Sequence, residues 1–145
     1  TMIDDYFNQF PKIKTFMDNT INLASKQGFV LTQAGRIRPL NEINSSNFSR
    51  RNFEQRAAVN TMLQGTAAEL IKQAMILISK KIKEKSLSSK MIIQVHDELV
   101  FDVFLSEKDE LIDLVRTEMQ SIADYSVDLL VDVEIGETWQ LINTS

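Results

Sequence analysis

The chain has 145 residues, of which 43% are hydrophobic, so it is long enough to bury a core and too apolar to be disordered by composition. It contains no cysteine, which excludes a disulfide framework and a thiolate metal site. No apolar run approaches about 18 residues and no signal-like start is visible, so we predict a soluble, non-exported protein with no membrane partner.

The net charge of −4 conceals an uneven distribution of charge along the chain. Residues 1–90 carry 14 Lys and Arg against 7 Asp and Glu, whereas residues 91–145 carry 2 against 13. A basic half can face phosphate, and an acidic half can hold divalent cations. Composition alone nevertheless favours the simpler interpretation that each half has a solvated charged surface.

The first predicted element is a helix over residues 3–26, where apolar residues recur at three- and four-residue spacing. Pro11 is predicted to start the main part of this helix, because proline is tolerated in a first turn and breaks a helix interior. Gly28 is predicted to end it.

Residues 29–40 predict a small hairpin that turns near Gly35. Arg36 and Arg38 lie two apart on the return strand and therefore share a face. They either grip phosphate or are solvated, and the sequence favours neither interpretation. Residues 41–49 are rich in Asn and Ser and predict a loop.

The longest predicted helix covers residues 50–83, because apolar side chains form one helical stripe along it. Gly65 is a weak point in this helix, costing on the order of 1 kcal/mol relative to alanine. A kink, or the close approach of another backbone or a ligand, would explain its presence. The basic, serine-containing residues 80–90 are predicted to form a connector.

Residues 91–104, with the sequence MIIQVHDELVFDVF, predict two short strands joined by a tight polar turn. Ser106 is the predicted N-cap of the next helix, whose first turn is acidic. Residues 129–135 alternate at their end and predict a last strand, which leads into a tail anchored by Trp139.

Three polar residues of the long predicted helix, Arg56, Asn60 and Gln64, lie four residues apart and form one gently drifting stripe. Their planar heads suit the minor groove of duplex DNA, where every base pair presents acceptors in nearly the same places. Polar residues at this spacing also occur on ordinary exposed helix faces, which is the commoner meaning of the pattern alone.

The polar turn of the second hairpin contains the only histidine, His96, and two adjacent carboxylates, Asp97 and Glu98. Carboxylates are hard ligands for Mg²⁺, and two-metal phosphoryl transfer needs at least two acids from separate places. Adjacent side chains on a strand point to opposite faces, so Asp97 and Glu98 are not expected to be equal ligands. Alone, such a triplet is more often an ordinary turn than a metal site.

Other enzyme classes find little support in the sequence. One histidine, no cysteine and no G-x-S-x-G motif exclude a standard serine triad and a thiol enzyme, and four scattered glycines cannot form a phosphate-binding loop. A divalent-metal hydrolase built on the hairpin would need a second acid cluster. Asp128, Asp132 and Glu134 are candidates only if the last predicted strand lies beside the hairpin turn.

Two runs, EQRAAVNTMLQGTAAELIKQAMILI at residues 54–78 and MIIQVHDELVFDV at residues 91–103, together resemble the C-terminal part of family-A DNA polymerases of the bacterial repair type. The resemblance covers nearly the whole chain. It implies an α+β fold with an antiparallel palm-type sheet, whose catalytic hairpin packs against long helices, and a partial fingers segment of helix and small hairpin. The implied subdomains are partial fingers at residues 1–50 and an incomplete palm at residues 51–145.

The resemblance implies a role for each residue that matches a family motif. Asp97 matches the metal-binding catalytic aspartate of the third motif, Glu98 a supporting catalytic residue, and His96 a neighbour of the primer terminus. The residues that match palm-helix contacts to primer–template DNA are Arg56, Asn60 and Gln64.

Three positions depart from the family pattern. Met62 replaces a usual proline, Glu69 replaces a usual aspartate, and Pro39 lies where an aromatic residue is more common. The first two changes are chemically small, although loss of the proline could relax the helix near Gln64.

The function implied by the resemblance is Mg²⁺-dependent transfer of nucleotides from deoxynucleoside triphosphates to a primer 3′ end, in DNA replication and repair. The family's first catalytic motif, with the other metal-binding aspartate, is absent from this sequence. We therefore expect the isolated chain to be inactive and to need the rest of a polymerase chain upstream. The alternative is a stand-alone nucleic-acid-binding module with a degenerate palm. The expected location is the bacterial cytoplasm, or an organelle or a phage-infected cell if the source differs.

Overall fold

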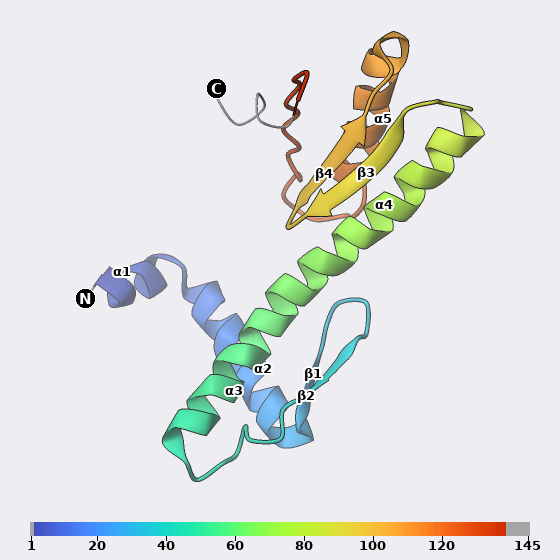
Figure 1. Ribbon diagram of the computed structural model, residues 1–145. Helices are drawn as coiled ribbons and strands as arrows, with labels where there is room; N and C mark the ends of the chain where they lie inside the picture. Colours follow the sequence, from blue (N-terminus) through green and yellow to red (C-terminus); the bar gives the residue numbers. More distant parts are fainter. Residues whose placement is uncertain (1, 139–145) are drawn as a thin grey trace. The chain divides into compact units, whose positions relative to one another are not determined.

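The computed structural model describes residues 2–138 and contains two compact units, which meet in sequence between Glu69 and Leu70. Figure 1 shows the elements of both units. The elements that precede the boundary are α1 (Met2–Gln9), α2 (Pro11–Gln27), β1 (Phe29–Leu31), β2 (Ile37–Pro39), α3 (Phe48–Asn60) and the π-helical turn η1 (Thr61–Gly65). Helix α4 (Thr66–Glu84) contains the boundary. It is followed by β3 (Lys90–Val95), β4 (Glu98–Asp102), the 3₁₀ turn η2 (Leu105–Glu107) and α5 (Lys108–Gln120).

Helix α2 begins and ends at the residues that the sequence predicts. Pro11 occupies its first turn, where the fixed φ of proline suits a helix and the missing N–H has no partner to lose. Gly28 ends the helix with φ 78°, and its N–H donates to the carbonyl of Ala24 at 2.8 Å. The predicted helix over residues 3–26 is therefore two helices, α1 and α2, separated just before Pro11.

The small hairpin and the loop after it are also confirmed. Strands β1 and β2 pair in antiparallel register, with Val30 opposite Arg38. The loop that follows is more than a solvated connector, because Leu40 and Ile43 are only 1% and 2% exposed. The buried apolar cluster of the first unit consists of Ala24, Val30, Leu40, Ile43 and Ala58. The loop thus fixes the hairpin to α2 and α3.

The long helical segment begins two residues earlier than predicted, because Asn47 caps it. The Asn47 Oδ1 atom accepts hydrogen bonds from the N–H groups of Ser49 at 3.0 Å and Arg50 at 3.2 Å. Regular α geometry ends at Asn60, the π turn η1 follows, and α4 resumes after Gly65. The interruption therefore falls at the glycine where the sequence predicts a weak point.

In the second unit, the hairpin β3–β4 packs against α4 and α5, and this packing of a hairpin against long helices was predicted (Figure 1). The buried cluster comprises Ala74, Ile78, Ile82, Leu111, Leu114 and Val115. Met91, Leu99 and Phe101 of the hairpin pack against it. The fold is α+β with antiparallel hairpins against helices, which confirms the predicted class.

Two ion pairs beside this core join α5 to the last turns of α4 and to the residue that follows α4. Lys81 Nζ donates to the carboxylate of Glu118, which is only 7% exposed, and Lys85 Nζ donates to Glu110 Oε1 at 2.6 Å. A buried carboxylate needs such a partner because burial without one is costly. Lys81 therefore satisfies the one charge that the α4–α5 interface buries within the described residues.

The start of α5 differs from the prediction that Ser106 is its N-cap. Ser106 lies inside η2, and the N-cap position is occupied by Glu107, whose side chain caps no helix N–H group. The Glu107 carboxylate instead accepts from the N–H groups of Ser88 and Ser89, both at 2.9 Å, and from Ser89 Oγ at 2.6 Å. The hydrogen bond from the Ser88 N–H, together with those from Ser89, lowers the pKa of Glu107. The prediction was wrong because a carboxylate can satisfy three donors of the preceding connector.

The prediction of a last strand over residues 129–135 is also wrong. These residues have no strand pairing in the structure, where β3 and β4 pair only with each other. Alternation of apolar residues predicts a surface that suits a sheet, but a strand also needs a neighbour to complete its hydrogen bonds. The predicted anchor Trp139 lies outside the described residues.

No helix among residues 2–138 combines the length and the apolar character needed to cross a membrane. The predicted subdomain boundary near residue 50 is a separate matter from the compact units, which meet at Glu69 and Leu70. The boundary near residue 50 stays a prediction.

Candidate active site and nucleic-acid interface

The second hairpin places its three polar residues at the turn between β3 and β4. His96 and Asp97 form the two-residue turn, and Glu98 opens β4 opposite Val95. His96 adopts φ 52°, a left-handed conformation that a glycine would favour at the first position of such a turn. The Gln94 side-chain amide donates to the His96 carbonyl at 2.5 Å and steadies this backbone.

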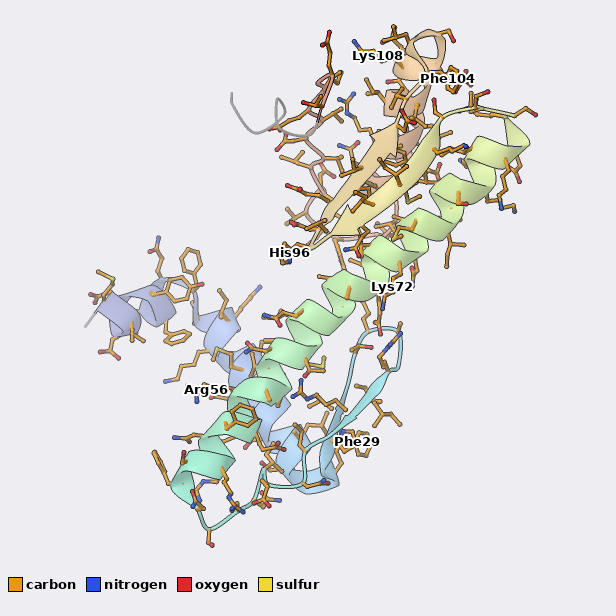
Figure 2. The ribbon with its side chains drawn as sticks, in the orientation of Figure 1. Phe29, Arg56, Lys72, His96, Phe104 and Lys108 are labelled. Carbon is orange, nitrogen blue, oxygen red and sulfur yellow. The ribbon has the colours of Figure 1, made fainter. Side chains whose placement is uncertain are left out.

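All three side chains of the turn are exposed, and Figure 2 shows His96 at the end of the hairpin. Within the described part of the chain, neither Asp97 nor Glu98 makes a side-chain hydrogen bond or ion pair. Asp97 lies in the turn rather than in the strand, so the alternation of faces applies only to Glu98. The two carboxylates thus differ in backbone setting, and their unequal roles stay a prediction.

The acids of the second unit do not gather around this turn. Among residues 2–138, no group of three or more His, Asp or Glu side chains is placed to hold a metal ion. The candidates Asp128, Asp132 and Glu134 therefore do not complete a metal cluster with the hairpin, and the strand expected to carry two of them is absent. A metal hydrolase built on the hairpin would need a second acid cluster beside the turn, and residues 2–138 do not provide one.

The predicted polar stripe, Arg56, Asn60 and Gln64, lies on the first unit with all three side chains exposed. Arg56 and Asn60 belong to α3, on which Figure 2 labels Arg56, whereas Gln64 belongs to the π turn η1. The stripe and the hairpin turn lie in different compact units.

A groove of about 550 Å³ runs beside the first two residues of the stripe. Its lining residues are Met17, Ile21, Phe48, Ser49, Asn52, Gln55, Arg56, Val59 and Asn60. Helix α2 contributes two apolar side chains, whereas α3 contributes Phe48 and Val59 together with all of the polar ones. Arg51 lies over the Phe48 ring, with Cζ 5.7 Å from the ring centroid. The groove extends the polar stripe with amide side chains and an aromatic ring.

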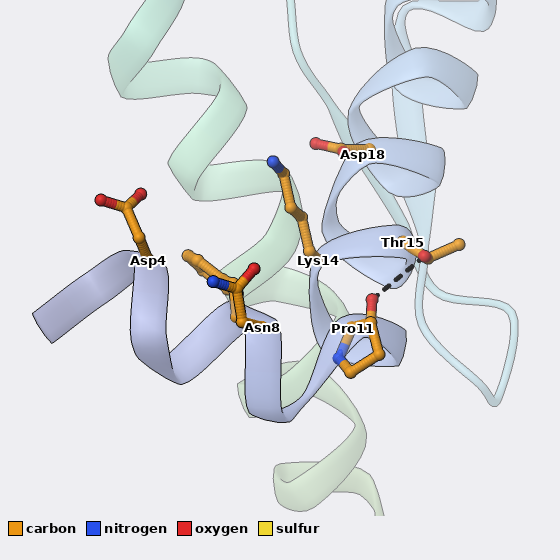
Figure 3. Close-up of a pocket in the computed structure, with 7 residues that line it drawn as sticks. Asp4, Asn8, Pro11, Lys14, Thr15 and Asp18 are labelled. Atoms are coloured by element: carbon orange, nitrogen blue, oxygen red, sulfur yellow. Dashed lines mark hydrogen bonds between the residues drawn. The ribbon is translucent and has the colours of Figure 1, made fainter. Parts of the chain in front are cut away.

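A hollow of about 340 Å³ lies between α1 and α2 (Figure 3). Asp4, Asp18 and Lys14 line it together with the Thr15 hydroxyl, which donates to the Pro11 carbonyl at 3.1 Å. Charges of both signs face this hollow, so it lacks the single-sign surface expected for phosphate.

Sequence reasoning noted Glu69 only as a departure from a family pattern, but the structure gives it several partners. Its Oε1 atom accepts from Thr32 Oγ1 at 2.5 Å and lies 3.4 Å from Arg36 Nε, while Oε2 accepts from the Ala34 N–H at 3.2 Å. The Thr32 hydrogen bond, with smaller effects of Ala34 and Arg36, lowers the Glu69 pKa against the opposing effect of burial. The carboxylate is 8% exposed.

The two arginines of the first hairpin are likewise engaged within the chain. Arg36 lies near Glu69, and Arg38 Nη1 donates to Thr61 Oγ1 at 3.1 Å. The sequence left phosphate binding and solvation open for these residues, and the structure shows a third use, the attachment of the hairpin to the helix. The sequence signal for this attachment was Glu69. It lies one residue after position 68, which continues the four-residue spacing of the polar stripe.

The chain matches the sequence model of DNA polymerase family A over residues 1–141. The DNA polymerases I of Caldicellulosiruptor bescii and Lactococcus lactis subsp. lactis are each 42% identical to it over 137 residues, and that of Mycobacterium leprae is 39% identical over the same length. Each match covers 94% of this chain, but only 16%, 16% and 15% of the respective relatives. The chain thus spans about a sixth of the length of these relatives.

A solved structure gives the same result. The POL domain of Pol1 from M. smegmatis, in complex with DNA primer-template and dNTP, superposes with a TM-score of 0.93 at 38% identity. The match covers 97% of this chain and 25% of that one. The family resemblance predicted from the two sequence runs is therefore confirmed, and the chain belongs to DNA polymerase family A.

Proposed function

We propose that this chain is the part of a template-directed DNA polymerase that carries the third catalytic motif and a primer–template contact helix. The whole enzyme would transfer nucleotides from deoxynucleoside triphosphates to a primer 3′ end in bacterial DNA replication and repair. The observation that carries the proposal is the structural similarity, at a TM-score of 0.93, to a polymerase domain solved with primer-template and dNTP. The proposed setting is the bacterial cytoplasm, in line with the bacterial relatives.

Asp97 is the proposed metal-binding catalytic residue and Glu98 its supporting carboxylate. Mg²⁺ takes one or two carboxylates together with substrate phosphates, so an exposed turn with one acid and a second beside it fits part of such a site. When bound, the metal would supply charge stabilisation for the attacking and leaving oxygens. Because residues 2–138 contain no three-residue acid cluster, a further carboxylate from outside these residues is needed. The isolated chain is accordingly proposed to be inactive.

The proposed nucleic-acid contacts are Arg56, Asn60 and Gln64 on the first unit and His96 on the second. The stripe presents donors to the minor groove, where purine N3 and pyrimidine O2 acceptors recur at every base pair. A grip on these acceptors holds the primer end of any sequence without reading it. His96, beside Asp97 in the turn, is proposed to contact the primer terminus.

The alternative function is a stand-alone nucleic-acid-binding module with a degenerate palm. The absence of a three-acid cluster within the described residues favours it to a limited degree, because binding needs no metal site. The reading frame upstream of Thr1 distinguishes the two: an open frame of several hundred residues supports the polymerase, and a stop codon there supports the module.

The binding part of the proposal can be tested on the chain itself. A labelled primer–template duplex is titrated with the chain at several salt concentrations, and affinity should fall by about 0.9 log units per phosphate contact per decade of salt. Gln64→Ala should weaken binding several-fold, whereas Gln73→Ala, an exposed amide on α4, is the matched control and should not. Absence of binding at low salt, or affinity that is independent of salt, contradicts the proposal.

The catalytic part is tested by primer extension. With Mg²⁺ and all four deoxynucleoside triphosphates, the isolated chain should add no nucleotide, whereas the full-length parent should extend the primer. Extension by the isolated chain would show that the missing carboxylate is not required.

A further inference from the structure

The turn of the first hairpin is attached to the helical segment by a buried carboxylate, Glu69. Its two oxygens accept from the Thr32 hydroxyl at 2.5 Å and from the Ala34 N–H at 3.2 Å. Arg36 Nε lies 3.4 Å from Oε1, and the Gln33 N–H donates to Thr66 Oγ1 at 3.3 Å. Residues that are about 35 apart in sequence are thus joined at one small contact. It fixes the hairpin turn to the first turn of α4.

Thr32 is held in one orientation by two hydrogen bonds of its hydroxyl. Its Oγ1 atom donates to Glu69 and accepts from the Arg36 N–H at 3.1 Å. This orientation turns its methyl group toward Gly65, where a Cβ atom would lie 2.6 Å from Thr32 Cγ2. Glu69 therefore sets how closely the hairpin approaches the π turn.

The contacts follow one row of the helical segment, which we call the docked row: Thr61, Gly65 and Glu69. Thr61 Oγ1 accepts from Arg38 Nη1, Gly65 receives the Thr32 methyl, and Glu69 holds the turn. Thr61 directly follows Asn60 of the polar stripe, and Gly65 directly follows Gln64. One residue corresponds to about 100° of rotation around an α-helix, so the two rows lie on neighbouring faces. Fixing the docked row therefore fixes the direction in which the stripe faces.

The π turn changes how the stripe lines up. In an α-helix, each step of four residues rotates a side chain forward by about 40°, so Gln64 would drift away from the line of Arg56 and Asn60. A π turn holds more residues because its hydrogen bonds close i→i+5, so four residues fall short of a full turn. The drift from Arg56 to Asn60 is thus offset between Asn60 and Gln64. The π turn Thr61–Gly65 is also the segment on which the hairpin docks, through Thr61 and Gly65.

We propose that Glu69 is a positioning residue, which holds the hairpin on the docked row and thereby keeps the π turn in the geometry that aligns Gln64 with Asn60 toward the minor groove. This inference rests on the proposed duplex contact of the stripe. It assigns to Glu69 an effect on DNA that operates through Gln64, without contact between Glu69 and DNA.

The experiment measures the affinity of the 145-residue chain for two primer–template duplexes. One is unmodified, and the other has a purine at the primer end whose minor-groove N3 is replaced by C–H, which removes one acceptor. The wild-type chain should bind the modified duplex about tenfold more weakly. Glu69→Gln should bind the unmodified duplex more weakly and should lose most of that discrimination.

Matched variants separate positioning from a general loss of structure. Thr32→Val removes the hydroxyl donor at nearly constant shape and should behave like Glu69→Gln, whereas Thr32→Ser keeps the donor and should keep the discrimination. Glu42→Gln removes a carboxylate of the same unit, whose Oε1 atom lies 3.7 Å from Arg50 Nη1. This control variant should leave the discrimination between the two duplexes unchanged. Thermal unfolding followed by circular dichroism confirms that each variant is folded at the assay temperature. The combination of Glu69→Gln with Gln64→Ala should be no worse than Gln64→Ala alone, since the two act on one contact.

The outcomes are distinguishable. If the wild-type chain binds duplex but Glu69→Gln keeps full discrimination, or if its effect adds to that of Gln64→Ala, the positioning role is overturned and the proposed function stands. If the wild-type chain binds duplex without sensitivity to the N3 replacement, the minor-groove alignment is overturned for the stripe and for Glu69 alike. If it does not bind duplex at all, the proposed function fails and the inference fails with it.

Discussion

A Cβ atom added to Gly65 would lie 2.6 Å from Cγ2 of Thr32, closer than real Cβ contacts occur. Thr32 cannot easily rotate away, because its hydroxyl is held by Glu69 and by the Arg36 N–H. A helix-interior glycine that costs stability by propensity is therefore kept for space. The hairpin and the helix approach at this point as closely as glycine allows.

Gly65→Ala is expected to destabilise the chain by about 1–2 kcal/mol, although alanine is the better helix former, because the added methyl overpacks the contact with Thr32. The free energy of unfolding from denaturant titration measures this. Ala67→Gly, at an exposed position of α4, is the reference for propensity alone and should cost about 1 kcal/mol. A Gly65→Ala chain that is more stable than wild type would show that the Thr32 side chain moves away from the added methyl group at little energetic cost.

Ser89→Ala is expected to destabilise the chain by about 1–3 kcal/mol, because the Ser89 hydroxyl joins Glu107 to the chain after β4. Ser89 is 1% exposed, and its Oγ donates to Glu107 at 2.6 Å and accepts from the Phe104 N–H at 3.0 Å. Ser88→Ala is the control, since Ser88 reaches Glu107 only through its backbone N–H. Equal losses for both variants in chemical unfolding would refute a role of the hydroxyl.

Stability should fall in acid through Glu69 and Glu107, whose pKa values are lowered in the folded chain by hydrogen bonds from Thr32 and Ser88 respectively. A carboxylate whose pKa is lowered by folding stabilises the fold at pH values above its ordinary pKa of 4.5. This contribution is lost as the pH falls through the lower pKa of the folded state. The free energy of unfolding is measured from pH 7 to pH 3 for wild type, Glu69→Gln and Glu107→Gln. The difference in this free energy between wild type and each variant should narrow below about pH 4.5. A gap that stays constant over this range would contradict the sign.

His96→Gly is expected to stabilise the fold by about 0.5–1 kcal/mol, because relief of a left-handed histidine outweighs the entropy of glycine. His96 holds φ 52° in the turn next to Asp97. If His96 also contacts the primer terminus, the same variant should bind primer–template less tightly. His96→Asn, which tolerates the left-handed region, should show the loss of binding with a smaller gain in stability. A variant that is both more stable and equally tight in binding would leave the histidine without a proposed role.

Asp97→Asn in the full-length parent should reduce nucleotide addition by roughly a thousandfold, because it removes a proposed ligand of the metal that stabilises developing charge. Binding of primer–template should change little. Glu98→Gln is the matched variant at the adjacent exposed carboxylate and should have a smaller effect on single-turnover extension. Equal losses for the two variants would contradict their division of roles.

The sequence predicted those elements whose signals are local. Proline and glycine at Pro11 and Gly28 mark the ends of α2, and the runs around His96 and Asp97 form the expected hairpin. The prediction of a site at this turn also depended only on neighbouring residues and on the family motif. Asp97 and Glu98 are both exposed at this turn.

The sequence by itself determined the family, both hairpins and the helical segments, though not the breaks within two of these segments, because periodicity, turn chemistry and a contiguous motif are properties of neighbouring residues. Tertiary structure decided the rest. Glu69 meets Thr32 across 37 positions, and Glu107 reaches back to Ser89 across 18, so neither carboxylate could be given its partners from spacing. Those contacts also explain why Gly65 is a glycine, since the methyl group of Thr32, far along the chain, fills the space beside it.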